Sequence, residues 1–224
     1  MSFGTSELAL PPQLREPVRQ HLEDLRKKYV AMDWARRVGF GQRPAVLVID
    51  LALFWTRPDT QMGSDLDPIV EATGRVLAAA RRANAPIFFS SYDFDATELP
   101  GLKPRKVRLN ASPQDAHLFN LDPRLQRRPN EKLFRKRHAS CFAGTNLMNI
   151  LATLNVDTLI VTGVSTSHCV YATCRDAAAA FRVIVPREAV GERCQIMHMV
   201  NLLDIDIDLG DVMPVADVIE HLER

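Results

Sequence analysis

Apolar residues along this 224-residue chain gather in short continuous runs, which alternate with stretches of helical periodicity. The runs at 44–51 (PAVLVIDL), 86–92 and 158–164 are flanked by proline or polar residues. Such runs are typical of parallel strands that are buried on both faces. Between the first two, apolar residues recur at helical spacing over 67–84, where a proline suits the first turn. The pattern predicts an α/β fold: a doubly wound, mostly parallel sheet flanked by helices.

Strands and helices alternate in this way to the end of the chain, and only residues 1–40 and 93–130 depart from the pattern. Further elements are expected as strands at 132–136, 182–186 and 211–214, and as helices at 145–154, 167–180, 192–203 and a last one ending at 222. Residues 1–40 contain one charged helix, about 16–37, whose apolar positions are sparse. We therefore assign 1–40 to an N-terminal helical extension, packed on the domain or on a neighbouring subunit, and 41–224 to the main domain. The proline-rich stretch at 93–130 is long for a loop, and such loops are usually functional or lie at subunit contacts.

Charge narrows the class of partner. Lys and Arg total 28 against 27 for Asp and Glu, so a net charge of +1 gives no overall attraction to nucleic acid or acidic membranes. The basic stretches 103–108 and 124–138 fit an anion-attracting rim, or a solvated face or subunit contact. The second interpretation is favoured, because aromatic residues do not interleave with the charges as in single-strand binders. We expect a small-molecule substrate, with no nucleic-acid or membrane partner.

The cysteines and the opening residues bear on the cellular compartment. The four cysteines lack the paired C-x-x-C spacing of zinc and redox sites. The opening MSFGTSELALPPQLREP is polar and proline-containing, unlike a signal peptide, and no apolar run approaches the length needed to span a bilayer. These features predict a reduced, cytoplasmic protein with free thiols.

Candidate chemistry lies where the predicted strands end, at Asp50, Lys136 and Cys169. Taken singly, each has an ordinary explanation: a turn cap, a surface charge and a buried thiol. Cys169, however, directly follows the most apolar strand and begins a helix. Unpaired backbone N–H groups and the helix dipole at that position are expected to lower the pKa of the thiol, and a nearby lysine would lower it further. A carboxylate beside the thiol could accept its proton.

Three motifs in this order resemble those of the isochorismatase-like cysteine hydrolases. PAVLVIDLALFW resembles their first strand and aspartate, KRHASCFAGTNL their lysine segment, and GVSTSHCVYATCRDA their nucleophile loop. The resemblance covers about 37–222. It implies that Asp50 is the general base, that Lys136 stabilises the thiolate and that Cys169 is the nucleophile of a covalent intermediate.

The resemblance also implies a non-proline cis peptide between Val164 and Ser165. The N–H groups of Ser165 and Cys169 would then form the oxyanion hole. Outside the shared motifs, RRVGFGQRPAVLVIDLALFWTRP, PREAVGERC and NLLDIDIDLGDV most resemble the N-carbamoylsarcosine amidases and maleamate amidohydrolases. In the first of these groups, an arginine matching Arg193 grips the substrate carboxylate, a task that suits a guanidinium. The alternative is that Arg193 only caps a helix or forms a structural ion pair.

The remaining substrate contacts are less specific. Thr166 and Ser167 are expected to hydrogen-bond the substrate or only to shape the loop, and Phe54 and Trp55 to wall the pocket or only to pack. His168 adjoins the nucleophile, but Asp50 already accounts for the proton transfer. Nicotinamidases of this superfamily bind a metal through an aspartate and several histidines, and LALFWTRPDTQMGSD and SSYDFDATE contain no histidine. We therefore expect no metal and no cofactor.

These observations predict a cysteine amidohydrolase that cleaves the C–N bond of a small linear carboxylated amide or carbamoyl compound, similar to N-carbamoylsarcosine, and releases ammonia. Maleamate hydrolysis is the alternative substrate assignment. Vinyl-ether hydrolysis of the isochorismate type and a catalytically silent binding protein remain open. The intact cysteine argues against the first, and the intact set of Asp50, Lys136 and Cys169 argues against the second. The resemblance also implies a homo-oligomer, with a tetramer favoured.

Overall fold

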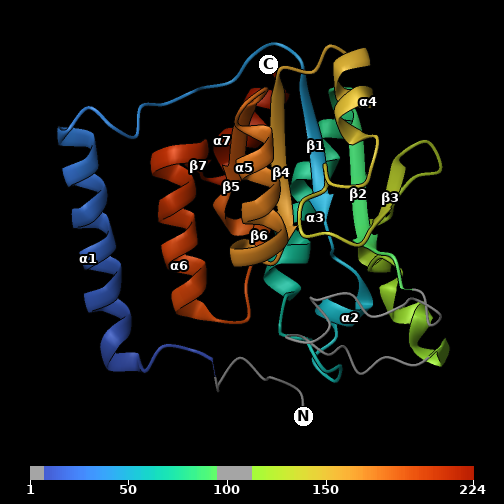
Figure 1. Cartoon of the computed structure of the whole chain (residues 1–224), viewed down its shortest axis with the longest axis horizontal. Helices are drawn as coiled ribbons and strands as arrows, with labels where there is room; N and C mark the ends of the chain where they lie inside the picture. Colours follow the sequence, from blue (N-terminus) through green and yellow to red (C-terminus); the bar gives the residue numbers. More distant parts are fainter. Residues whose placement is uncertain (1–7, 95–112) are drawn as a thin grey trace.

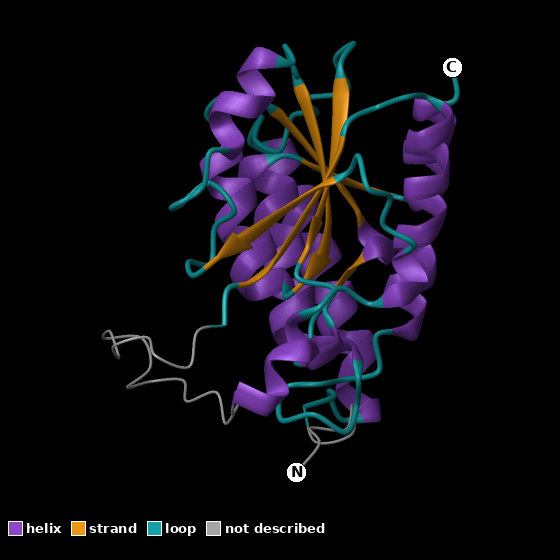
Figure 2. Cartoon of the chain, turned by 90° about the vertical axis from the view of Figure 1, so that its right-hand side faces the viewer, coloured by secondary structure: helices purple, strands orange, loops and turns teal. Residues whose placement is uncertain are grey.

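A computed structural model of the chain describes residues 8–94 and 113–224. Within these residues seven parallel strands form one sheet, in the order β3-β2-β1-β4-β5-β7, with β6 paired to β4 (Figures 1 and 2). The strands are β1 (Pro44–Ile49), β2 (Ile87–Tyr92), β3 (Lys132–Lys136), β4 (Thr158–Val164), β5 (Arg182–Pro186), β6 (Val190–Gly191) and β7 (Asp211–Met213). The predicted doubly wound, mostly parallel sheet is confirmed, and β1 lies at its centre.

Helices cover both faces of the sheet, and the side chains of each strand point alternately into one of two hydrophobic cores, one on each face. Val46 and Val48 of β1 pack against α3 (Asp67–Arg82) and α7 (Val215–Leu222) on one face. Leu47 and Ile49 face the opposite core, which is closed by the helices α4 (Leu147–Thr153), α5 (Tyr171–Ala177) and α6 (Gln195–Asp204). Because all strands are parallel, their carboxyl ends lie at one edge of the sheet, where ligands bind in folds of this class.

Short helical elements complete the described chain. They are α2 (Leu53–Thr56), the 3-10 turns η2 (Pro113–Phe119), η3 (Pro123–Leu125) and η5 (Arg187–Ala189), and the π-helical turns η4 (Thr166–Val170) and η6 (Ile205–Leu209). The helix expected at 167–180 is therefore split into a π turn and α5, and β6 and α2 were not predicted. The expected loop at 93–130 contains η2 and η3, and its part at 95–112 lies outside the described residues.

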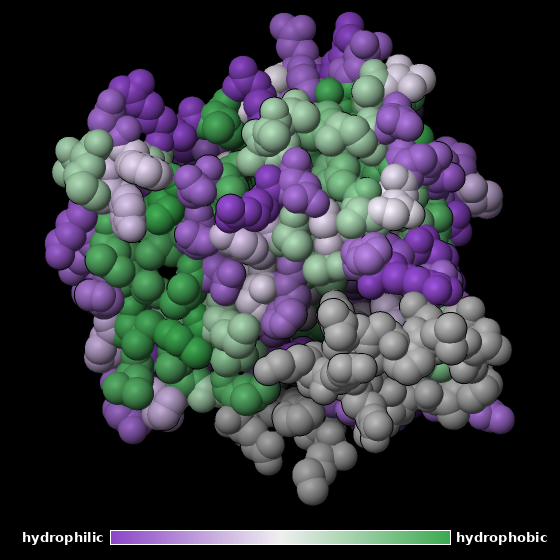
Figure 3. All heavy atoms as spheres, viewed as in Figure 1, coloured by the Kyte–Doolittle hydropathy of each residue, from purple (hydrophilic) through white to green (hydrophobic). Residues whose placement is uncertain are grey.

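The N-terminal helix α1 (Pro12–Ala31) stands apart from the main domain, beside α6 (Figure 1). None of its residues is buried, and it ends before the expected residue 37. Ion pairs hold the segment in place: Arg26 and Arg37 both bind Asp206, at 2.5 and 2.7 Å. Apolar side chains are exposed on α1 and α6, where Figure 3 shows a hydrophobic patch. No described helix is long and apolar enough to cross a membrane.

Candidate active site

Asp50 directly follows β1 and has an unusual backbone conformation. Its φ is 53°, in the left-handed region that non-glycine residues rarely adopt and that concentrates at functional sites. The Asp50 N–H donates to the Ser90 carbonyl oxygen (3.1 Å). The Ser90 hydroxyl donates to the Asp50 carboxylate at Oδ1 (2.8 Å). Asp50 is only 4% exposed, so its second oxygen, Oδ2, must find its partner within the protein.

That partner is Lys136, the last residue of β3, whose side chain crosses β2 to reach the end of β1. Its ammonium donates to Asp50 Oδ2 at 2.7 Å and to the carbonyl oxygens of His138 and Ala139 at 3.2 Å each. The crossing is possible because β2 presents the small, fully buried Ser90 there. Burial by itself would lower the pKa of Lys136, but the charge of Asp50 opposes it, an ionised Cys169 would add to that effect, and the pKa lies above its ordinary value. The buried lysine therefore stays charged.

Cys169 completes the cluster from the turn that follows β4. Its Sγ lies 3.3 Å from Lys136 Nζ, in the π-helical turn η4, a kind of turn frequent at functional sites. Burial raises the pKa of the Cys169 thiol and the nearby Asp50 charge adds to the rise, while Lys136 opposes it. The expectation of a lowered pKa was therefore wrong in direction. It considered the helix terminus and the lysine, but not the desolvation of the thiol or the carboxylate beside it.

Gly163 allows the strands that carry Asp50 and Cys169 to approach closely. It pairs with Ile49 across β1 and β4, and its φ is 106°. A Cβ atom at Gly163 would lie 2.0 Å from the Ile49 carbonyl oxygen. Only glycine suits this position. The following peptide bond, Val164–Ser165, is cis in the structure.

Two side chains that the sequence argument did not single out support the cluster. Ser90 binds Asp50, as described above. The Thr173 hydroxyl donates to the Cys169 carbonyl oxygen at 2.6 Å and accepts from the Cys141 N–H at 3.1 Å. It thereby joins the helix after the nucleophile to the loop after Lys136. In the sequence, a polar residue at the end of an apolar strand was the available signal for Ser90, whereas Thr173 offered none.

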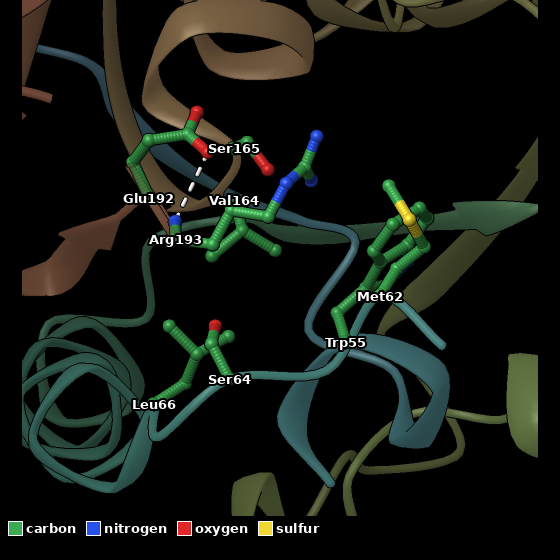
Figure 4. Close-up of a pocket in the computed structure, with 8 residues that line it drawn as sticks. All are labelled: Trp55, Met62, Ser64, Leu66, Val164, Ser165, Glu192 and Arg193. Atoms are coloured by element: carbon green, nitrogen blue, oxygen red, sulfur yellow. Dashed lines mark hydrogen bonds between the residues drawn. The ribbon is translucent and has the colours of Figure 1, made fainter. Parts of the chain in front are cut away.

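A pocket lies beside the end of β4, where Val164 and Ser165, the residues just before the turn of Cys169, form part of its lining (Figure 4). Its other lining residues are Trp55, Met62, Ser64, Leu66, Glu192 and Arg193. The Arg193 guanidinium projects into the space beside Ser165 and pairs with no carboxylate in the described part of the chain. The pocket therefore combines apolar walls with one basic and one acidic side chain, Arg193 and Glu192.

The two aromatic residues after Asp50 have different surroundings. Trp55 lines the pocket, and its indole Nε1 is buried without a hydrogen-bond partner among the described residues. Phe54 is 2% exposed, stacks on Phe119 and is not among the pocket residues. The structure thus supports packing for Phe54, the second of the two interpretations offered for it.

Thr166 and Ser167 use their hydroxyl groups within the protein. The Thr166 hydroxyl donates to the Gly191 carbonyl oxygen at 3.0 Å and lies 2.9 Å from His198 Nδ1. The Ser167 hydroxyl donates to Glu192 at 2.5 Å. Both side chains therefore shape the nucleophile turn. His168, which lies in the same turn, is exposed. Among the residues in view, no group of three or more His, Cys, Asp or Glu side chains is arranged to hold a metal ion.

Comparison with known proteins places this geometry in a family. Residues 44–217 match the family described as "Isochorismatase domain". An N-carbamoylsarcosine amidase from an Arthrobacter species is 36% identical over 203 residues, which cover 87% of this chain and 77% of that protein. A maleamate amidohydrolase from Pseudomonas putida is 32% identical over 200 residues, covering 85% and 92%.

Solved structures agree at the level of the fold. A cysteine hydrolase from Pseudomonas syringae pv. phaseolicola superposes with a TM-score of 0.75 at 21% identity, over 85% of this chain and 97% of that one. An N-carbamoylsarcosine amidase from Thermoplasma acidophilum superposes with a TM-score of 0.66 at 20% identity, over 78% and 97%. Since the family match spans most of the chain and two relatives exceed 30% identity, the chain belongs to the isochorismatase family.

Proposed function

We propose that the chain is a cysteine amidohydrolase acting on small linear amides or carbamoyl compounds that carry a carboxylate. The observation that carries this proposal is the position of one buried ammonium group. Lys136 Nζ lies 2.7 Å from the Asp50 carboxylate and 3.3 Å from the Cys169 sulfur. A base, a cation and a nucleophile in contact are the parts that acyl transfer through a thiol requires.

The geometry supports a two-step reaction. Asp50 takes the thiol proton as Cys169 Sγ attacks the carbonyl carbon, and the N–H groups of Ser165 and Cys169 receive the developing oxyanion. The tetrahedral intermediate collapses, the C–N bond breaks, and the leaving nitrogen takes the proton from Asp50 and departs as ammonia. Water, deprotonated by Asp50, then attacks the thioester carbon, and the released sulfur recovers its proton.

The pocket supports a carboxylated substrate. Arg193 offers a guanidinium that pairs with no carboxylate of residues 8–94 or 113–224, at the end of the pocket that adjoins Ser165. A guanidinium binds a carboxylate through two parallel hydrogen bonds. The walls formed by Trp55, Met62 and Leu66 would cover the apolar part of a short molecule. The names of the two relatives give two candidate substrates, N-carbamoylsarcosine and maleamate. Both combine a carboxylate with an amide-type nitrogen.

Ammonia release from N-carbamoylsarcosine, from maleamate and from acetamide, which has no carboxylate, tests the proposal. We expect activity on at least one of the first two and little on acetamide. Cys169→Ala should abolish it, whereas Cys194→Ala, which removes another partly exposed thiol, should leave it intact. Mass spectrometry of Cys169→Ala and of the wild type during turnover should show an acyl adduct only in the wild type. Undiminished turnover in Cys169→Ala would contradict the mechanism.

We also propose that the chain forms a homo-oligomer. The supporting observation is the exposed apolar surface of α6, formed by Ile196, Met197 and Val200 beside the unburied helix α1 (Figure 3). Sedimentation velocity should show a mass above that of one 25.1 kDa chain, and Val200→Glu should lower it. A single monomeric species at micromolar concentration would contradict this part of the proposal.

A further inference from the structure

A buried carboxylate, Glu192, joins the nucleophile turn to the segment that carries Arg193. We propose that Glu192 is a positioning residue, which holds the turn of Cys169 and the backbone of Arg193 in register with each other. The part that concerns Arg193 rests on the function proposed above, whereas the part that concerns Cys169 does not. Glu192 acts through its neighbours, and the thiol it positions belongs to the turn Thr166–Val170.

The contacts of Glu192 use both carboxylate oxygens. Oε1 accepts from the Arg193 N–H at 3.0 Å, the bond drawn as a dashed line in Figure 4. Oε2 accepts from the Ser167 N–H at 3.2 Å and from the Ser167 hydroxyl at 2.5 Å. The side chain is only 1% exposed, so protein donors take the place of water around it.

The charge of Glu192 is matched to these donors. Burial alone would raise its pKa, but the nearby His168 ring, the hydrogen bonds from Ser167 and the charge of Arg193 outweigh it and hold the pKa at about 2. A carboxylate only accepts hydrogen bonds, and each of its main partners here donates one. A glutamine of the same shape would turn an NH₂ group towards a backbone N–H in either orientation of its amide.

A second set of hydrogen bonds, made by Thr166, also fixes the nucleophile turn. The Thr166 hydroxyl donates its single proton to Gly191, so the hydrogen shared with His198 must come from Nδ1 of that histidine. Burial lowers the pKa of His198, in keeping with a neutral ring. Two successive residues of the nucleophile turn are thus bound to the segment 191–193 and to α6. Loosening one of them would move Cys169 Sγ relative to Lys136 Nζ.

The rate at which iodoacetamide alkylates Cys169 measures this positioning without any amide substrate. For Glu192→Gln we expect alkylation and kcat to fall by at least about tenfold, since a hydrogen bond to a charged group is lost. We also expect KM to rise for a carboxylated substrate, because Arg193 loses its backbone anchor. The matched control is Glu131→Gln, another buried glutamate that accepts a backbone N–H, at Arg128, and that pairs with Arg81 away from the nucleophile turn. It should unfold more easily and yet be alkylated at the wild-type rate.

A double-mutant cycle separates positioning from a general loss of stability. Ser167→Ala removes one of the contacts of Glu192, so the double variant should lose less than the product of the two single losses. Alkylation, kcat and KM of Glu192→Gln within twofold of the wild type would overturn the proposal. If Glu192→Gln does not fold, Ser167→Ala alone carries the test, with a threefold slower alkylation expected and an unchanged rate contradicting it. Slower alkylation in a protein that releases no ammonia would keep the role of Glu192 and refute the proposed function.

Discussion

Replacing Lys136 by methionine tests the centre of the mechanism, because methionine keeps most of the side-chain volume and removes the charge together with the N–H donors of the ammonium. Lys136 Nζ lies 3.3 Å from Cys169 Sγ. At this distance, with an effective dielectric constant of about 20, an ammonium stabilises a thiolate by roughly 5 kcal/mol. Cys169 is partly exposed, so solvent screens some of this interaction. We expect a loss of about 3 to 5 kcal/mol in the transition state, or roughly 10² to 10⁴ in rate.

Two assays report this loss. Steady-state ammonia release should fall mainly in kcat, and alkylation of Cys169 by iodoacetamide should slow in parallel. Lys132→Met is the matched control: Lys132 is exposed at the opposite end of the same strand, and its replacement should change neither rate. Alkylation of Lys136→Met at more than a tenth of the wild-type rate would refute the argument, since the thiolate would then not depend on the lysine.

The same variant has a second consequence, for stability. Asp50 and Lys136 form an ion pair whose side chains are 5% and 3% exposed. Removing one partner of a buried pair typically costs about 3 to 5 kcal/mol, because the other charge is left uncompensated. Urea denaturation should show this loss in Lys136→Met and a partial recovery in Lys136→Met with Asp50→Asn. Catalysis should not return in the double variant, which distinguishes the folding role of the pair from its chemical role.

Four further predictions concern other parts of the structure. Gly163→Ala should prevent folding, because its Cβ would lie 2.0 Å from the Ile49 carbonyl oxygen. Gly74→Ala, in open space within α3, should instead stabilise the protein by up to about 1 kcal/mol, and its melting temperature should rise. Because the pKa of Glu192 is lowered from 4.5 to about 2, its contribution of roughly 3 kcal/mol is fully present above pH 4.5 and is lost as the pH falls towards 2. Glu192→Gln should therefore lose less urea stability than the wild type between pH 5 and pH 3, and an equal loss would contradict the assignment. Trp55→Phe removes an indole donor that has no hydrogen-bond partner among residues 8–94 and 113–224, so its urea midpoint should shift little, since no described hydrogen bond is lost. A rise in KM without a change in kcat would show that the indole contacts the substrate.

The regular elements could be predicted closely because burial and strand pattern coincide along most of the chain. The strands Thr158–Val164 and Arg182–Pro186 lie where the apolar runs predicted them. The N-terminal helix ends at Ala31 instead of about residue 37. Beyond it, Arg37 binds Asp206, some 170 residues away in the sequence, and such a contact leaves no local signal.

The site could be predicted only where a motif and a strand end coincided. Asp50, Lys136 and Cys169 meet this condition, and the structure brings them into contact. Ser90 and Glu192 do not. Each binds a residue that is distant in the sequence: Ser90 binds Asp50, 40 residues away, and Glu192 binds Ser167, 25 residues away. Sequence periodicity specifies which face of an element is buried, but not which polar group of another element it meets there.

The raised pKa of the Cys169 thiol and its role as a nucleophile are compatible once the charge of the whole cluster is counted. In the resting state a neutral thiol stands beside an Asp50 carboxylate and a Lys136 ammonium, and the three groups sum to zero. Transfer of the thiol proton to Asp50 gives a thiolate, a neutral acid and the same ammonium, and the sum is again zero. A buried site penalises net charge because it solvates charge poorly. The internal transfer keeps the net charge at zero, and so avoids the cost of losing the thiol proton to bulk water. The lysine remains charged throughout and changes only the partner that it stabilises, from Asp50 to Cys169. A thiol that resists ionisation alone but gives its proton readily to Asp50 is therefore what this arrangement of three residues should produce.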